Sequence, residues 1–444
     1  MSKTGNVTKT ASRSAREGGR DEGRVSRITD AYEKAKDAYA AFGVDTGKAV
    51  KAALDLPVSV QCWQGDDVTG FEGADGITGG GILATGNYPG RARNGDELRA
   101  DAEFAFSLIP GKKRFNLHML YAEPEGKTRP GRDELEPGHF KKWMDWSKKK
   151  KIPLDFNPSF FSHPLAARGY TLSSADSAVR KFWIRHGAAS RRIASAFGEN
   201  QGSPAVNDIW IPDGSKDMPA DRLSPRKRLR DALDEILSGS LPPKTITDAV
   251  ECKLFGIGSE AYVVGSHEFY MGYAVSKQIK LCLDTGHFHP TETIADKISA
   301  MLLFVPGLLI HFSRGLRWDS DHVAVFSDEM RDACREARRT GSLDRIDFSL
   351  DYFDASINRI AAWAIGARSL RKALLEAMLE PTALLVDAEK KEKYHRRLAL
   401  MEELKTLPFG AVWDKLCLDG GVPPGADWLD PVDIYEESVL LKRK

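Results

Sequence analysis

The sequence predicts an α/β protein built as a closed (β/α)8 TIM barrel with a C-terminal helical extension. Three observations lead to this fold class. Eight short apolar runs alternate with helical segments over residues 28–380, unusual polar and aromatic residues follow those runs, and the length of 444 residues suits one barrel with an appendage, or two domains. The remaining residues, 381–444, are helical and charged, so we expect a C-terminal arm that contacts a neighbouring subunit.

The expected strands are short apolar or β-branched runs bounded by turn residues. In chain order they cover residues 57–62, 114–120, 153–157, 205–211, 248–254, 279–283, 308–310 and 345–350. Periodicity and capping residues predict the helices, with Ser173 or Ser174 as the N-cap of the helix over 174–197. The other helices cover residues 28–42, 95–108, 137–151, 224–237, 268–280, 291–303, 328–339 and 356–379.

Composition limits the partners that the chain can have. Residues 1–27 carry seven Lys or Arg against three Asp or Glu and lack an apolar face, which favours a disordered basic tail over a targeting segment. The net charge of +1 offers no bulk attraction to nucleic acid or to a membrane, and the apolar window over 298–313 is too short to span a bilayer. Five cysteines without CxxC spacing favour a reducing, cytoplasmic location.

Metal-competent side chains gather in the second half of the chain. Asp284 and His311 each end an apolar run, His287 follows the first run, and Asp319 and Asp321 follow the second. Oxygen and nitrogen donors without cysteine suit a hard or borderline divalent ion. Each residue alone has an ordinary explanation: Asp284 could stabilise a turn, His311 could be a core histidine, and Asp319 could cap a helix.

Further polar residues fall at the ends of other expected strands. Glu251 and Lys253 share one face of their strand by alternation, and a buried carboxylate there needs either Lys253 or a metal ion as its partner. His118 lies in the second strand, and Asp351 ends the eighth. Such residues would not collect at one end of the repeat by chance, and we therefore expect the working face there.

Two tryptophans follow strands at the same end of the repeat. Trp63 comes after the first strand and Trp210 ends the fourth. Such tryptophans are core residues unless a ligand is present, and a sugar ring stacks on an aromatic face through apolar contact that leaves its hydroxyls free to bond.

Seven long segments carry a family resemblance. They read CWQGDDVTGFE (62–72), TGNYPGRARN (85–94), LDFNPSFFSHPL (154–165), IWIPDGSKD (209–217), LDTGHFHPTE (283–292), RWDSDHV (317–323) and LDYFDASINRIAAW (350–363). Together they closely resemble the bacterial L-rhamnose isomerase family. The resemblance extends from about Thr29 into the C-terminal region and departs in the N-terminal tail and near residues 123–134.

The resemblance implies a xylose-isomerase-like barrel, a homotetramer and two divalent ions, typically Mn²⁺. The residues that match the family's structural-ion ligands are Glu251, Asp284, His311 and Asp351. Those that match its catalytic-ion ligands are His287, Asp319 and Asp321. Lys253 matches the lysine beside the substrate oxygen, and His118 matches the histidine beside the sugar ring oxygen. Trp63, Phe161, Trp210 and Glu251 would contact the substrate.

The implied reaction is interconversion of L-rhamnose and L-rhamnulose in L-rhamnose catabolism. His118 would assist ring opening, and a metal-assisted hydride shift would follow, with an enediol route through Asp351 and a water as the alternative. A phosphodiesterase or nuclease would want more histidine ligands and a basic groove, and a sugar-binding protein would not need two ion sites. An isomerase of other sugars stays open, because the tolerance of a pocket wall cannot be read from motifs.

Overall fold

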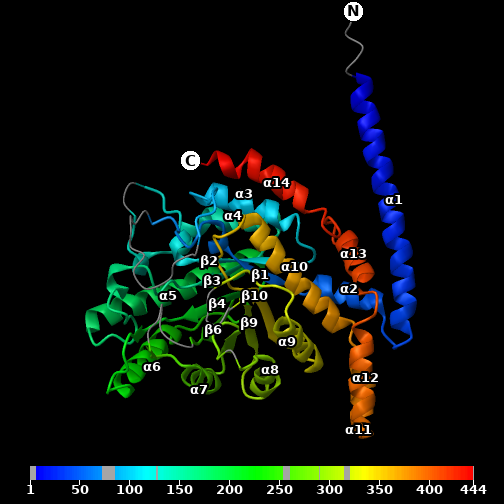
Figure 1. The fold of residues 1–444 in the computed structure, drawn as a ribbon. Coiled ribbons are helices and arrows are strands. Elements are labelled where there is room, and N and C mark those ends of the chain that lie inside the picture. Colours follow the sequence, from blue (N-terminus) through cyan, green and yellow to red (C-terminus); the bar gives the residue numbers. More distant parts are fainter. Residues whose placement is uncertain are drawn as a thin grey trace, which may run out of the picture.

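Eight parallel strands close into a barrel at the centre of the molecule, and helices surround it (Figure 1). This computed structural model describes residues 7–72, 86–126, 129–253, 261–289, 291–314 and 321–443, with side chains from residue 23 onward. The barrel strands are β1 (Val58–Gln61), β2 (Lys113–His118), β3 (Leu154–Asn157), β4 (Ala205–Trp210), β6 (Ile246–Glu251), β8 (Lys280–Asp284), β9 (Leu308–Phe312) and β10 (Ile346–Leu350). The expected fold class, a (β/α)8 barrel with C-terminal helices, is confirmed.

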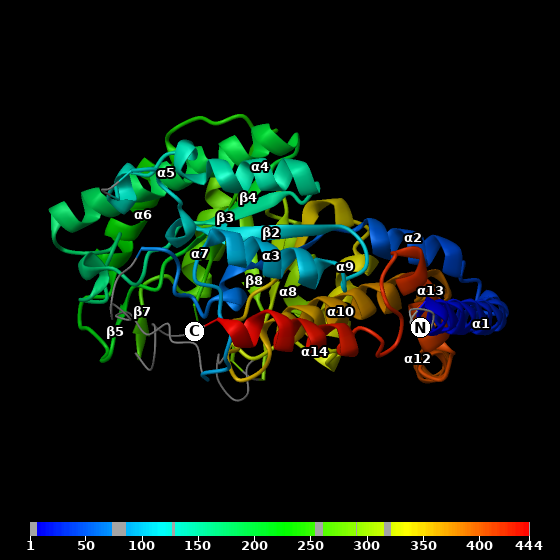
Figure 2. The ribbon, with the colours of Figure 1, turned by 90° about the horizontal axis from the view of Figure 1, so that it is seen from above.

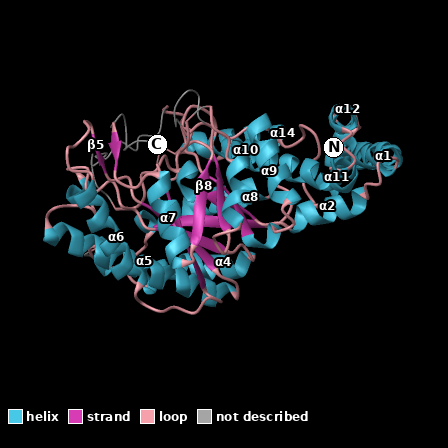
Figure 3. Cartoon of the chain, turned by 90° about the horizontal axis from the view of Figure 1, so that it is seen from below, coloured by secondary structure: helices cyan, strands magenta, loops and turns pink. Residues whose placement is uncertain are grey.

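Strands that follow one another in the chain are neighbours in the barrel, and β1 closes the ring by pairing with both β2 and β10. Every residue of β1, β3, β4 and β9 is buried. Helices cover the outer faces of the strands (Figure 3). Buried apolar side chains of the strands belong to one continuous core with those of the helices. A two-stranded sheet of β5 (Gly214–Ser215) and β7 (Tyr262–Val263) lies outside the barrel and was not expected from the sequence.

The helices around the barrel are α2 (Thr46–Asp55), α3 (Gly95–Phe106), α4 (Lys141–Lys150), α5 (Ser177–Gln201), α6 (Leu223–Leu237), α7 (His267–Lys277), α8 (Ala295–Leu302), α9 (Asp328–Arg339) and α10 (Arg359–Met378). Those from α3 onward lie within a few residues of their predicted ranges, and α2 is a separate helix after the segment predicted over 28–42. In α9, the Ser327 side chain accepts a hydrogen bond from the Met330 amide. Acidic residues in the first turn stabilise the helix by their interaction with its dipole.

The predicted cap of α5 is wrong. The N-cap is Asp176, whose side chain accepts from the Ala178 amide. Ser173 is not available because its hydroxyl and its amide both donate to Asp213. Ser174 instead accepts a hydrogen bond from the Asp176 amide. A tertiary contact thus moved the helix start by a few residues.

Helices from the two ends of the chain form a second apolar core beside the barrel. The C-terminal helices are α11 (Thr382–Lys390), α12 (Tyr394–Leu404), α13 (Phe409–Asp419) and α14 (Leu429–Ser438). Trp413 and Leu416 of α13 pack with Tyr32 of α1 (Val7–Ala40) and Val50 of α2. The helix α14 instead returns along the barrel, where Tyr435 stacks on Phe104 of α3 with ring centroids 4.2 Å apart (Figure 2).

The backbone has no boundary at residue 28, because α1 begins at Val7 and projects away from the barrel (Figure 1). The expectation that residues 1–27 form a disordered tail stays a prediction, as does a subunit contact for the C-terminal arm. None of the helices in the described ranges is both long enough and apolar enough to cross a bilayer.

Candidate active site

Four buried acidic and histidine side chains meet at the carboxyl ends of neighbouring strands. Glu251 ends β6, Asp284 ends β8, His311 lies in β9, and Asp351 follows β10. The register pairs Asp284 directly with His311, so both side chains lie at one level of the barrel. One ligand atom from each of the four residues lies within 4.8 Å of the other three. The parallel barrel therefore gathers residues that are 100 positions apart in the sequence.

The His311 imidazole lies at the centre of this acid–histidine cluster. Its Nδ1 atom is 3.1 Å from Asp351 Oδ2, 3.6 Å from Glu251 Oε1 and 3.8 Å from Asp284 Oδ2. The other Asp284 oxygen, Oδ1, accepts hydrogen bonds from the Gly286 amide and from the Ser313 hydroxyl. One Asp284 oxygen is thus held by the protein, and the second faces the cluster.

The electrostatics of the acid–histidine cluster fit a cation. Burial raises the pKa of Asp284 and of Asp351, because it disfavours the charged carboxylate, and the nearby Glu251 carboxylate acts in the same direction. Burial works against the His311 imidazolium, but its anionic neighbours outweigh burial and raise the His311 pKa. Asp351 Oδ1 is buried without a hydrogen-bond partner among the described residues. Three carboxylates and an imidazole are an ordinary donor set for Mn²⁺ or a similar divalent ion.

His287 and Lys253 adjoin the acid–histidine cluster. His287 Nδ1 lies 3.0 Å from Glu251 Oε1, and His287 Nε2 lies 3.4 Å from Lys253 Nζ. The Lys253 ammonium also lies over the Trp210 ring, 5.2 Å from its centroid. We expected Lys253 on the same strand face as Glu251, and this expectation is wrong. The strand β6 ends at Glu251, and Lys253 lies in the segment that follows. Glu251 and Lys253 each contact His287, so an ion pair between the two is not needed to account for the burial of Glu251.

The remaining ligands of the second expected ion are less well defined. Asp319 lies outside the described residues. Asp321 is described and has a left-handed backbone with φ of 49°, which is uncommon for a residue other than glycine. It directly precedes His322, which forms an isolated antiparallel β-bridge with Arg314. The ligand set of His287, Asp319 and Asp321 stays a prediction.

Aromatic side chains form a continuous wall along one side of the site. Trp63 stacks on His118 with ring centroids 4.2 Å apart and contacts Phe161 at 6.5 Å. Phe161 lies 5.7 Å from Trp210, and Trp210 lies 6.5 Å from His287. The wall brings together Trp63, His118, Phe161 and Trp210, the site residues expected at or after the ends of the first four strands. It ends at the acid–histidine cluster, where a stacked ligand would reach the acidic groups.

His118 is neutral in this environment. Burial lowers the His118 pKa to about 3, and the nearby His311 acts in the same direction. Its Nε2 atom lies 3.0 Å from Gln61 Oε1. A neutral imidazole keeps one nitrogen as a proton acceptor, which is what proton transfer from a hydroxyl requires.

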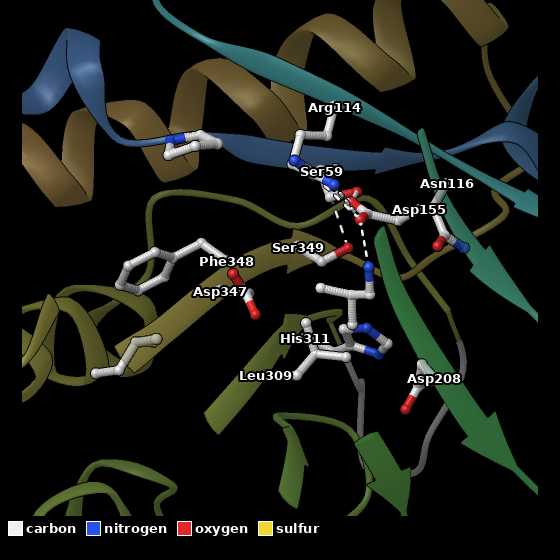
Figure 4. Close-up of a pocket in the computed structure, with 13 residues that line it drawn as sticks. Ser59, Arg114, Asn116, Asp155, Asp208, Leu309, His311, Asp347, Phe348 and Ser349 are labelled. Carbon is white, nitrogen blue, oxygen red and sulfur yellow. Dashed lines mark hydrogen bonds and ion pairs between the residues drawn. The ribbon is translucent and has the colours of Figure 1, made fainter. Parts of the chain in front are cut away.

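A small cavity of about 30 Å³ lies inside the barrel beneath His311 and is lined by residues from several barrel strands (Figure 4). It extends from Pro57 and Asp347, at the amino ends of strands, to His311 and Asp208. The Ser59 hydroxyl donates to Asp155, which also pairs with Arg114 (Figure 4). The charges near its base are therefore satisfied within the barrel.

Sequence reasoning missed two residues of the site. Asp208 and Cys282 form a second group with Glu251 and His311, with ligand atoms again within 4.8 Å. Strand alternation could have found both, because Asp208 lies two positions before Trp210, and Cys282 two positions before Asp284. They lie one layer deeper in the barrel than the residues at the strand ends.

These features define a (β/α)8-barrel enzyme whose acid–histidine cluster could bind a metal ion beside an aromatic pocket. The family model for L-rhamnose isomerase (RhaA) matches residues 26–443. An L-rhamnose isomerase of Rhodopirellula baltica is 57% identical over 420 residues, which covers 95% of this chain and 98% of that protein. One of Escherichia coli is 56% identical over 419 residues, or 94% and 100% of the two chains. The chain belongs to the L-rhamnose isomerase family.

Among solved structures, an L-ribulose 3-epimerase aligns with a TM-score of 0.47 and 12% sequence identity. The alignment covers 72% of this chain and 95% of that one.

Proposed function

We propose that the chain interconverts L-rhamnose and L-rhamnulose, an aldose–ketose isomerisation that begins the breakdown of L-rhamnose. The observation that carries the proposal is the acid–histidine cluster of Glu251, Asp284, His311 and Asp351 at the end of a wall that contains His118. An aldose needs both parts: a polar group to open its ring and a charged site to activate the open chain. Curated relatives of nearly the same length are named L-rhamnose isomerases.

We further propose two divalent ions, Mn²⁺ by preference. The acid–histidine cluster would hold the first, and His287, Asp319 and Asp321 would hold the second, with coordination positions left open for water. The ions would supply Lewis-acid polarisation and charge compensation for the sugar oxygens. The support is the buried donor set of the first site and the position of His287 against Glu251.

The first chemical task falls to His118, since rhamnose binds as a closed pyranose. The neutral imidazole accepts the proton of the anomeric hydroxyl and returns it to the ring oxygen as the carbon–oxygen bond opens. The low pKa of His118, about 3, keeps the imidazole neutral near physiological pH. The stacked Trp63 ring excludes water from one face of that imidazole.

Lys253 acts on the open chain. Its ammonium lies at the junction of Trp210 and His287, between the aromatic wall and the acid–histidine cluster. A cation there stabilises the negative charge that develops on the first and second sugar oxygens during isomerisation. The Trp210 face and its Nε1 group, which is buried without a hydrogen-bond partner among the described residues, orient the sugar.

Hydrogen then moves between the second and first carbons by one of two routes. We favour a hydride shift, which needs polarisation of the carbonyl but no base at carbon. The alternative is an enediol formed by proton abstraction through Asp351 and a water. A substrate deuterated at the second carbon distinguishes them, because extensive loss of label to solvent would rule out a pure hydride shift.

A panel of aldoses, assayed with Mn²⁺ and after chelator treatment, tests the function. We expect L-rhamnose to give the highest kcat/KM and the chelator to abolish turnover. Absence of L-rhamnose turnover with Mn²⁺ present would overturn the proposal. Preferential turnover of another aldose would favour a related sugar isomerase, the second candidate function that this pocket allows.

We also propose a cytoplasmic homotetramer. The five cysteines are buried and form no disulfide, as a reducing compartment favours. Tyr394 and Leu398 are exposed on α12, one turn apart, and offer an apolar strip for a neighbouring subunit. Light scattering that gave the mass of a monomer, 49.1 kDa, would contradict the assembly.

A further inference from the structure

Amide side chains connect His118 to the acidic side of the barrel. Asn157 Nδ2 donates to Asp208 Oδ2 at 3.0 Å, and Asn116 Nδ2 donates to Asn157 Oδ1 at 2.7 Å. Asn116 Nδ2 also donates to Gln61 Oε1, which lies 3.0 Å from His118 Nε2. All five side chains are at most 4% exposed, so water does not compete for these bonds. We call this row the amide chain.

The direction of each hydrogen bond in the amide chain follows from its neighbour. Oδ2 of Asp208 accepts from the nitrogen of Asn157, so the oxygen of Asn157 faces the nitrogen of Asn116. The nitrogen of Asn116 then faces Gln61, which must present its oxygen. A reversed Gln61 amide would bring two donors together in a buried site, at the cost of an unmade hydrogen bond.

An amide oxygen cannot donate, so the bond between Gln61 and His118 requires the proton to be on Nε2 of the imidazole. The other ring nitrogen, Nδ1, is buried and has no hydrogen-bond partner among the described residues. In a neutral imidazole it is the one nitrogen that can accept a proton.

We propose that Gln61 is a positioning residue that holds His118 in the tautomer with its proton on Nε2, so that Nδ1 is the base in ring opening. The assignment rests on the proposed function of His118. Gln61 sets the rotation of the ring within its plane, and the stacked Trp63 sets the plane itself. The Gln61 backbone is fixed in turn, because its carbonyl accepts from Trp363 Nε1 at 2.9 Å.

The proton transfer balances without another reactant. Nδ1 of His118 takes the proton of the anomeric hydroxyl, whose oxygen forms the carbonyl bond as the bond from the first carbon to the ring oxygen breaks. The electron pair stays on the ring oxygen, which receives the proton back from Nδ1. His118 ends in its starting tautomer, because its second proton stays on Nε2, where it is hydrogen-bonded to Gln61 Oε1.

Kinetics of two Gln61 variants test the assignment. Gln61→Leu removes the acceptor at similar volume, and we expect kcat for L-rhamnose to fall roughly 10–100-fold with little change in KM. Gln61→Glu keeps an oxygen toward both Asn116 and His118, so it should recover most of the activity. Equal losses in the two folded variants, or no loss in Gln61→Leu, would overturn the proposal.

Gln64→Leu is the matched control. Gln64 is also a buried glutamine near the end of the first strand, and it exchanges two hydrogen bonds with the Asp354 backbone. Its loss should lower stability as much as the loss of Gln61, but it should leave the His118 tautomer unchanged.

Nitrogen-15 NMR of histidine-labelled protein reports the tautomer without any turnover, with the His118 signals assigned by their loss in His118→Gln. We expect a protonated Nε2 and an unprotonated Nδ1 in the wild type and in Gln64→Leu. We expect a mixture of tautomers in Gln61→Leu. A protonated Nδ1 in the wild type would overturn the proposal even for an active enzyme. Failure of the proposed function would instead be seen as absent wild-type turnover with the expected NMR pattern intact.

Discussion

Nδ1 of His287 lies 3.0 Å from Oε1 of Glu251. The two residues were assigned to different ions from the sequence, and this contact makes the two proposed ion sites neighbours. If both residues bind ions, each would orient the other, and we expect loss of either side chain to weaken ion binding at both sites.

Removal of a cluster carboxylate should weaken metal binding. We expect Glu251→Gln to lower Mn²⁺ affinity by at least about 100-fold, since even residues that only support a ligand contribute on the order of 10–100-fold. Isothermal titration of the metal-free protein measures the change. Glu235→Gln on the exposed face of α6 is the control and should bind as the wild type does. Unchanged affinity in Glu251→Gln would remove Glu251 from the ligand set.

Asp319→Asn should abolish isomerase activity and leave folding nearly intact, because the expected role of Asp319 is to bind an ion. Activity with saturating Mn²⁺ and the thermal midpoint are measured together. Asp217→Asn, at an exposed position, serves as the control for both. Gross unfolding of the Asp319 variant would indicate a structural role.

Lys253→Gln should lower kcat on the order of 10²–10³-fold, the usual effect of removing one group that stabilises developing negative charge. Lys277 is a matched control, because its ammonium also lies over an aromatic ring, 5.6 Å from the Tyr273 centroid, but outside the site. Steady-state kinetics of Lys277→Gln should match the wild type. Equal effects of the two substitutions would show that Lys253 acts on stability and not on the reaction.

Asp66 should make stability depend on pH. Burial raises its pKa from 3.8 to about 7, although Tyr121 donates to one oxygen and the Gly70 amide to the other. Between these values the folded protein holds a proton that the unfolded chain has released, so stability falls as pH rises toward 7 and then levels. The free energy of unfolding falls by about 4 kcal/mol at most, which corresponds to a pKa difference of roughly three units.

Asp66→Asn tests this assignment, because the amide cannot ionise and can still bond to Tyr121 and Gly70. Thermal midpoints at about pH 5 and about pH 8.5 should differ less in this variant than in the wild type. A variant with the same pH dependence as the wild type would exclude Asp66 as the group responsible.

The second half of the site was largely predictable from the sequence. Glu251 and Asp284 end their strands, Asp351 directly follows one, and His311 is the second-last residue of another. In a parallel barrel all such ends point the same way, so their convergence followed from the fold class. The segment bounds were less certain, as the Asp176 cap shows, because a tertiary contact of Ser173 decided where α5 begins.

The deeper layer of the barrel was harder to predict. Gln61, Asn116 and Asn157 lie within strands, where a polar residue reads from sequence as an outward-facing position. Only the folded barrel shows that they lie side by side on the adjacent strands β1, β2 and β3 and satisfy each other's hydrogen bonds.

The sequence by itself determined the strand–helix repeat, the end of the barrel that carries the chemistry, and most of the residues there. Alternation and strand direction are local properties, and they suffice for this. The tertiary structure alone decided that α13 packs on α1 beside the barrel and that Gln61 lies against Nε2 of His118. Each of these depends on which buried polar or apolar groups meet across the closed barrel or between distant ends of the chain, and no local pattern encodes such meetings.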